Sequence, residues 1–96
     1  MTDGPLMTNS LDIVMYSTAW CGYCQRARSL LERKGVAVRE IKIDEDPQDR
    51  DTMLQRSGGR RTVPQIFIGE RHVGGYDDLA ALDRAGELDK LLGKSP

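Results

Sequence analysis

The sequence predicts an α/β domain in which helices flank a four-stranded mixed sheet, in the order βαβαββα. Two patterns in the chain carry this prediction. A strand–helix–strand pattern comes first, and such units join parallel strands through a right-handed crossover. A strand–turn–strand pattern over residues 63–73 follows, which predicts a hairpin and therefore an antiparallel edge. The length of 96 residues suits a single domain.

The first half of the chain supplies the parallel unit. Residues 12–17 form a run rich in apolar side chains, which is typical of a strand buried on both faces. Residues 21–34 are expected to form a helix, because their apolar side chains recur at helical spacing and Gly35 follows as a C-terminal stop. Residues 36–43 are expected to return as the second strand, with Ile41 and Ile43 on one face.

The second half of the chain supplies one more helix, a hairpin and the closing helices. Asp46-Pro47 indicates a helix start, with an N-cap side chain followed by proline at the first helical position. The remaining expected elements are a helix over 48–56, strands over 63–68 and 71–73 around the Gly69-Glu70 turn, a helix opened by Asp77-Asp78, and a short helical turn near Leu88, Leu91 and Leu92.

Composition excludes several classes of function. The net charge of −1 gives no support for a nucleic-acid or membrane-surface partner. The apolar runs are far shorter than the roughly 20 residues of a spanning helix, and the polar residues 1–10 do not resemble a signal peptide. We therefore expect a disordered tail over 1–10, one domain over 11–93, a cytoplasmic location and a monomer in the apo state.

Cys21 and Cys24 are the residues with the clearest chemistry. Zinc needs four ligands, and with His72 the chain offers only three soft or imidazole donors, although half of a metal site or two unrelated thiols remain alternatives. Cys21 lies where a strand gives way to a helix, so unpaired N–H groups and the helix dipole should lower the pKa of its thiol. Cys24 follows one turn later, which favours a redox pair with Cys21 as nucleophile and Cys24 as resolving thiol.

Two further segments carry a weaker signal. Thr62-Val63-Pro64 places a proline at the start of a core strand, and the residues alone favour an ordinary strand-edge proline over a cis Val63–Pro64 bond. Residues 74–78, Gly-Gly-Tyr-Asp-Asp, are by themselves best interpreted as a turn with an N-cap aspartate. The alternative is a helix start whose free N–H groups hold a carboxylate, with Asp77 beside a ligand ammonium group.

Together these three motifs resemble the small dithiol glutaredoxins of bacteria. The resemblance runs from about Ile13 to Leu92 and rests on Cys21-Gly22-Tyr23-Cys24, Thr62-Val63-Pro64 and residues 74–78. It implies a thioredoxin fold, a cis Pro64, and a glutathione-dependent thiol–disulfide oxidoreductase that reduces protein–glutathione mixed disulfides and protein disulfides. The glutathione-binding residues that the resemblance implies are Tyr23, Thr62, Val63, Pro64, Gly75, Tyr76 and Asp77.

Four positions depart from the commonest family pattern. Gly22 replaces a proline between the cysteines, Trp20 stands where threonine is frequent, and Tyr76 where cysteine is frequent. Thr18 stands where a lysine commonly meets the glycyl carboxylate of glutathione. We hypothesise that Arg60 or Arg61 supplies this missing positive charge.

Other interpretations remain open at this point. Some glutaredoxins without the inter-cysteine proline bridge a 2Fe–2S cluster between two subunits, so Gly22 and Trp20 make a cluster carrier or redox sensor, with Cys21 as ligand, the alternative function. A thioredoxin proper is disfavoured by Tyr23. His72 is expected to be an exposed strand residue and not a catalytic base, and the acidic residues 44–46 a solvated helix start and not a calcium loop.

Overall fold

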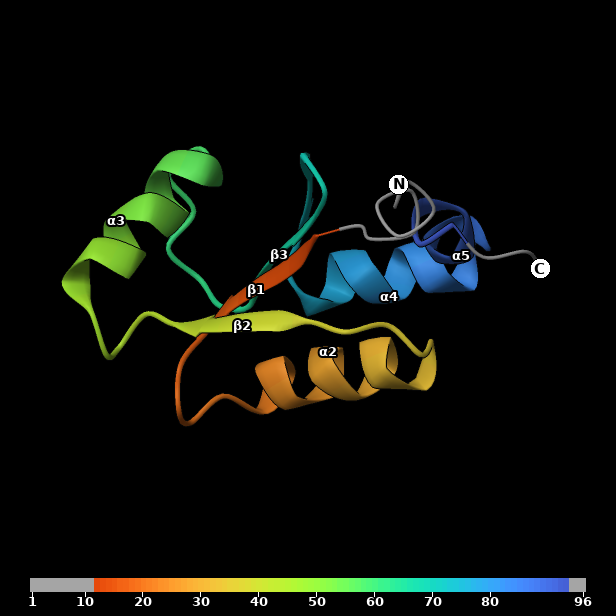
Figure 1. Cartoon of the computed structure of the whole chain (residues 1–96), viewed down its shortest axis with the longest axis horizontal. Helices are drawn as coiled ribbons and strands as arrows, with labels where there is room; N and C mark the ends of the chain where they lie inside the picture. The colour runs from red at the N-terminus through yellow and green to blue at the C-terminus, as the bar shows by residue number, and fades with distance from the viewer. Residues whose placement is uncertain (1–11, 94–96) are drawn as a thin grey trace, which may run out of the picture.

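The computed structural model describes residues 12–93, so the tail expected over 1–10 lies outside the described residues. The predicted order of strands and helices is confirmed, including the short helical turn expected near Leu88 at the end (Figure 1). The elements are β1 (Ile13–Ser17), α2 (Gly22–Arg33), β2 (Arg39–Lys42), α3 (Pro47–Arg56), β3 (Gln65–Ile68), β4 (Arg71–Gly74), α4 (Tyr76–Arg84) and α5 (Glu87–Leu91).

The strands form one mixed sheet in the order β2-β1-β3-β4. β1 runs parallel to β2 and antiparallel to β3, and β3 pairs antiparallel with β4, as the strand–helix–strand unit and the hairpin predicted. The central strands β1 and β3 are buried along their whole length. Helices therefore cover the sheet on both faces, which is the arrangement of a thioredoxin fold.

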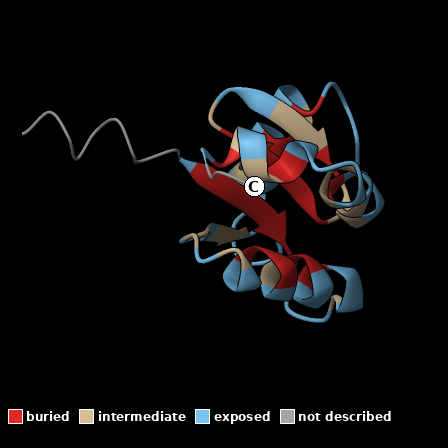
Figure 2. Cartoon of the chain, turned by 90° about the vertical axis from the view of Figure 1, so that its right-hand side faces the viewer, coloured by how far each residue is buried: buried red, intermediate tan, exposed pale blue. Residues whose placement is uncertain are grey.

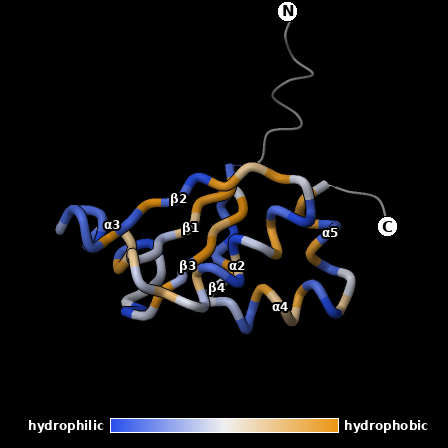
Figure 3. Tube along the Cα trace, turned by 90° about the horizontal axis from the view of Figure 1, so that it is seen from below, coloured by the Kyte–Doolittle hydropathy of each residue, from blue (hydrophilic) through white to orange (hydrophobic). Residues whose placement is uncertain are grey.

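Alternate residues of the central strands enter two separate cores, because successive side chains of a strand point to opposite faces. Ile13 and Met15 face α2, α4 and α5, where they pack with Leu31, Leu79 and Leu88 in the larger core. Val14, Tyr16 and Phe67 face α3 and pack against its Met53. In Figure 2 the buried residues of the helices lie on the sides that face the sheet. Figure 3 shows the apolar strands at the centre of the chain trace. No helix within residues 12–93 is long and apolar enough to cross a membrane.

Two strands are shorter than the sequence predicts. β2 begins at Arg39 and not at residue 36, because Val36 and Val38 pack against the larger core without joining the ladder. β3 begins at Gln65 and not at residue 63, since Pro64 has no N–H to donate to a neighbouring strand. The apolar character of these residues therefore indicated burial, but it did not indicate that they pair with a neighbouring strand.

A polar cluster fastens α2 to the sheet beside the larger core. Arg28 of α2 donates from Nε and Nη2 to the two carboxylate oxygens of Glu40 on β2, at 2.8 and 2.7 Å. The hydroxyl of Ser17, at the buried end of β1, donates to the same carboxylate. The hydrogen bonds from Arg28, aided by that from Ser17 and opposed by partial burial, lower the pKa of Glu40, and Glu40 raises the pKa of Arg28. This cluster fixes the rotation of α2, which carries Cys24 and begins directly after its N-cap residue Cys21.

Replacing Glu40 with glutamine should destabilise the fold by about 1–2 kcal/mol at pH 7, because Arg28 loses its charged partner at a partly buried site. The depressed pKa of Glu40 means that its contribution is present above about pH 4.5 and is lost as the pH falls further. Urea unfolding of the wild type and Glu40→Gln at pH 7 and pH 3.5 measures both effects. Glu45→Gln, at an exposed position, is the matched control. A Glu40→Gln deficit of the same size at both pH values would contradict this assignment.

Candidate active site

Cys21 lies at the predicted junction between strand and helix. It ends the loop after β1 and is the N-cap residue of α2, with extended backbone angles. The backbone N–H of Cys24 donates to Cys21 Sγ at 3.0 Å, and the N–H of Gln25 donates to the Cys21 carbonyl at 3.1 Å. One of the first-turn N–H groups of α2, which have no helical partner, is therefore aimed at the sulfur of Cys21.

The two cysteines have unequal access to solvent. They are joined in a disulfide across a Cα–Cα distance of 5.2 Å. Cys24 is 1% exposed and belongs to the larger core, whereas Cys21 is only partly buried against that core. An external disulfide can therefore reach Cys21 but not Cys24, and Cys24 can react only with a partner already attached to Cys21.

Thr62-Val63-Pro64 lies directly beside the disulfide. The Val63–Pro64 bond is cis, so the expectation drawn from the family resemblance is confirmed and the strand-edge interpretation drawn from the residues alone is wrong. Cys21 Sγ lies 3.9 Å from the carbonyl oxygen of Val63, a van der Waals contact in the disulfide form, which has no S–H donor. Pro64 is buried, and Thr62 is exposed to solvent.

Residues 74–78 form a tight entry into α4. The helix begins at Tyr76 with Gly75 at the N-cap, and the carboxylate of Asp78 accepts a hydrogen bond from the Gly75 N–H at 2.9 Å. The expectation of an N-cap aspartate is therefore wrong, because Asp78 closes the turn from inside the helix. Gly74 has φ +114°, and a Cβ there would clash with the carboxylate of Asp78. A bulkier residue could not hold this turn without displacing Asp78.

The three motifs, which are far apart in the sequence, converge around Cys21. A Cβ on Gly75 would lie 3.6 Å from the Pro64 carbonyl, so the Gly75 turn lies next to the cis peptide. The rings of Tyr23 and Tyr76 stack with centroids 6.2 Å apart. The structure thus groups Cys21, Tyr23, Val63, Pro64, Gly75 and Tyr76, with Thr62 and Asp77 exposed at the rim.

The two candidate cations, Arg60 and Arg61, are placed differently. Arg60 is half-exposed and its Nη1 lies 3.7 Å from Asp78 Oδ2, so it is tied to the start of α4. Arg61 is exposed and forms no ion pair within residues 12–93. Arg61 is therefore the freer of the two charges next to Thr62.

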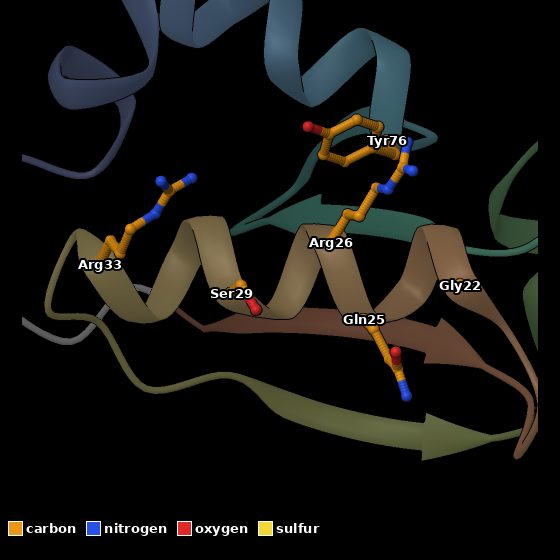
Figure 4. Close-up of a pocket in the computed structure, with 6 residues that line it drawn as sticks. All are labelled: Gly22, Gln25, Arg26, Ser29, Arg33 and Tyr76. Carbon is orange, nitrogen blue, oxygen red and sulfur yellow. The ribbon is translucent and has the colours of Figure 1, made fainter.

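A groove of about 570 Å³ runs along α2 beside the disulfide. It is lined by Gly22, Gln25, Arg26, Ser29, Arg33 and Tyr76. Figure 4 shows the side chains of Arg26 and Arg33 rising from α2 toward α4, whereas Gln25 points the other way. The guanidinium of Arg26 lies 5.6 Å from the centroid of the Tyr23 ring. The groove starts next to Cys21 and is positively charged, and the neighbouring Trp20 is 96% exposed.

Sequence reasoning missed the environment of His72 and the role of Gln65. His72 was expected to be exposed, but it is half-buried, and its Nε2 lies 2.7 Å from Gln65 Oε1. Burial, together with the nearby guanidiniums of Arg60 and Arg56 and against the pull of Asp78, lowers the pKa of His72. The available signal was a glutamine inside an otherwise apolar strand directly after Pro64.

The described residues give no reason to prefer a metal function. Within residues 12–93, no group of three or more histidine, cysteine or carboxylate side chains is arranged to hold a metal ion. The acidic residues 44–46 serve the fold, since Asp46 caps α3 and Asp44 accepts from the Ala19 N–H at 3.1 Å. Nothing in the part of the chain that the structure describes favours the iron–sulfur alternative.

Comparison with known proteins gives a consistent result. The family model called Glutaredoxin matches residues 13–73. A glutaredoxin of Pseudomonas aeruginosa is 60% identical over 80 residues, which cover 83% of this chain and 94% of the relative. Glutaredoxin 3 of Escherichia coli is 51% identical over 81 residues, covering 84% and 96%.

Solved structures agree with these relatives. The crystal structure of a buckwheat glutaredoxin–glutathione complex has a TM-score of 0.78 and 34% identity, covering 92% of this chain and 82% of that one. The solution structure of a glutaredoxin from Brucella melitensis has a TM-score of 0.75 and 48% identity, covering 92% and 97%.

Proposed function

The chain belongs to the glutaredoxin family and is a thiol–disulfide oxidoreductase, and we propose that glutathione is its reductant. In this proposal it reduces protein–glutathione mixed disulfides and protein disulfides, with Cys21 as nucleophile and Cys24 as resolving thiol. The observation that carries the proposal is the unequal pair: an accessible Cys21 sulfur receives a helix N–H at 3.0 Å, while Cys24 is buried behind it. The buckwheat relative, which was solved with glutathione, supports the choice of reductant.

Glutathione mixed disulfides need only Cys21. The Cys21 thiolate attacks the glutathione sulfur, forms a new S–S bond to it, and expels the protein thiolate, which takes up a proton. The N–H of Cys24 stabilises the attacking thiolate in the reduced enzyme. A second glutathione, as thiolate, then attacks the bound glutathione sulfur and releases oxidised glutathione, which returns Cys21 as thiolate. The net exchange consumes one free glutathione for each mixed disulfide and yields the protein thiol and one oxidised glutathione.

Protein disulfides need both cysteines. Attack by Cys21 opens the substrate disulfide and leaves one substrate sulfur bonded to Cys21. Cys24 then attacks Cys21 Sγ, releases the second substrate thiol, and closes the Cys21–Cys24 disulfide that the structure contains. Two glutathione molecules reduce this disulfide through a Cys21–glutathione intermediate. Because Cys24 is buried, its attack is directed at Cys21 alone.

The groups around Cys21 match the parts of glutathione. Tyr23 flanks its sulfur, and the main chain of Val63, beside Cys21 Sγ, pairs with its cysteine residue above Pro64. The γ-glutamyl carboxylate meets N–H groups of the first turn of α4, where Gly75 allows close approach and Tyr76 and Asp77 have no helical partner. The carboxylate of Asp77 accepts from the γ-glutamyl ammonium group.

This placement leaves the groove along α2 for the polypeptide of the protein substrate. The groove begins at Gly22, next to the reacting sulfur, and Arg26 and Arg33 favour acidic segments within it. A glutathione-dependent reductase also needs the glutathione pool that keeps cytosolic thiols reduced, so a cytoplasmic location belongs to the proposal.

Replacing each cysteine with serine should have a different effect on activity. Cys21→Ser should lose at least about 1000-fold in activity toward a glutathionylated peptide, because a serine hydroxyl is not ionised near neutral pH. Cys24→Ser should stay within about threefold of the wild type on that substrate, since the one-thiol route does not use Cys24. A coupled assay that follows oxidised glutathione measures both.

A protein-disulfide substrate serves as the internal control, because Cys24→Ser should fail on it while it still turns over the glutathionylated peptide. Equal losses for the two variants on the glutathionylated peptide would contradict the assigned roles.

Arg61→Ala should raise the apparent KM for glutathione by about two- to fivefold at low salt, because an exposed cation next to Thr62 attracts the glycyl carboxylate. Arg60→Ala should have the smaller effect, since Arg60 is engaged with Asp78. The Arg61 effect should shrink at 0.5 M salt as charges are screened. Arg50→Ala, on the exposed side of α3, is the control. Unchanged KM values in both Arg60 and Arg61 variants would remove this assignment.

A further inference from the structure

Gln65 is a polar residue in the middle of an apolar environment. It is the first residue of β3, its exposed fraction is 0%, and Pro64 of the candidate active site precedes it. A buried amide without partners would be costly, so its hydrogen bonds must be accounted for. Both ends of the amide have partners within the described residues. One end reaches Thr62, and the other reaches His72 on β4.

The direction of every bond in this chain follows from Thr62. The Thr62 carbonyl can only accept, so the group 3.0 Å from it must be the Gln65 amide nitrogen. The same nitrogen lies 3.2 Å from Thr62 Oγ1 and also donates there. Gln65 Oε1 therefore faces His72 and accepts, which makes His72 Nε2 the donor at 2.7 Å. The neutral ring then carries its proton on Nε2.

The packing of His72 supports one fixed orientation of its ring. The ring stacks on Phe67 of β3, with centroids 4.7 Å apart and planes at 21°. The guanidinium carbon Cζ of Arg56 lies 4.0 Å from the centroid of the Phe67 ring, so a cation also packs on this aromatic pair. The charged groups that act on His72 are Arg60 and Arg56, which disfavour its protonation, and Asp78, which favours it. A ring held in this way presents Nε2–H to Gln65.

We propose that His72 is a positioning residue for the glutathione site. Through Gln65 it fixes Thr62, whose Oγ1 already accepts a hydrogen bond and whose hydroxyl proton is therefore free to donate to a carboxylate or carbonyl oxygen of the glutathionyl group. His72 touches no substrate in this arrangement and acts only through Gln65 and Thr62. The inference rests on the proposed function and deepens it, because it assigns the donor direction at one contact of the glutathione site.

The hydrogen bonds from His72 through Gln65 to Thr62 form a relay. A double-mutant cycle tests whether this relay positions Thr62 or whether His72 has a merely structural role. His72→Phe keeps an aromatic ring for stacking on Phe67 but removes the donor, and Thr62→Val removes the hydroxyl at nearly constant shape. His72→Phe should raise the KM for a glutathionylated peptide about fivefold, the equivalent of about one hydrogen bond, with kcat changed less than about twofold. In the Thr62→Val background, His72→Phe should have no further effect on KM.

Two more variants sharpen the cycle. His72→Gln, which has an N–H donor but no ring, should recover part of the lost affinity, whereas Arg71→Gln on the exposed side of β4 should behave as wild type. Additive effects of His72→Phe and Thr62→Val, or an unchanged KM in His72→Phe, would overturn the inference. A fall in kcat and thermal stability with KM unchanged would mean a structural role only.

A second measurement decides the relay without glutathione. Nitrogen-15 NMR of the His72 ring in the free protein should show Nε2 protonated and Nδ1 unprotonated near pH 7.5, and the Gln65 side-chain amide should be protected from exchange in the wild type and less so in His72→Phe. The opposite tautomer would overturn the inference. A wild type that does not turn over a glutathionylated peptide with glutathione would refute the proposed function, and these NMR results would still report on the His72–Gln65–Thr62 hydrogen bonds.

Discussion

The hydrogen bond from the Cys24 N–H to Cys21 Sγ is the interaction on which the chemistry of this protein depends. It exists because α2 starts at Gly22, immediately after a loop from a buried central strand, and leaves a first-turn N–H aimed at the preceding sulfur. The rest of the fold keeps that geometry in place. Leu30 and Leu31 anchor one side of α2 in the larger core, and the Arg28–Glu40 pair fixes its rotation against β2.

The two faces of the sheet support different parts of the site. The face covered by α2 and α4 holds the reacting sulfurs and the Gly75 turn, and the N-cap of each helix lies beside the cis peptide at Pro64. The face covered by α3 holds Phe67, with the His72 ring stacked on it and Gln65 two residues before it on the same side of β3. Thr62 and Pro64 lie in the segment just before β3, with Cys21 and Gly75 on one side and Gln65 on the other. The segment around the cis bond is therefore supported from both faces of the sheet. Within residues 12–93 the buried polar side chains Ser17, Gln65 and Ser57 all have hydrogen-bond partners, which avoids leaving buried groups unpaired.

The sequence predicted the fold class, the order of elements and the position of Cys21 because these depend on local patterns. Hydrophobic periodicity located α2, and the Asp46-Pro47 pair located the start of α3. Features that depend on contacts between distant segments were missed or misjudged. The residues alone gave no reason to choose a cis Pro64, since that state needs the surrounding strands and loops to hold it, and only the family resemblance suggested it. The burial of His72 and the partner of Glu40 likewise require knowing which strands and helices are neighbours.

A titration of the Cys21 thiol tests the central claim most directly. The Cys24→Ala variant leaves a single thiol and keeps the backbone N–H of residue 24, so thiolate absorbance as a function of pH reports Cys21 alone. If the helix start stabilises the thiolate, the pKa of Cys21 should lie below about 7, and it should return toward the ordinary value of about 8.5 when the fold is lost in denaturant. A thiol that ionises near 8.5 in the folded protein, as in an unstructured peptide, would contradict the account.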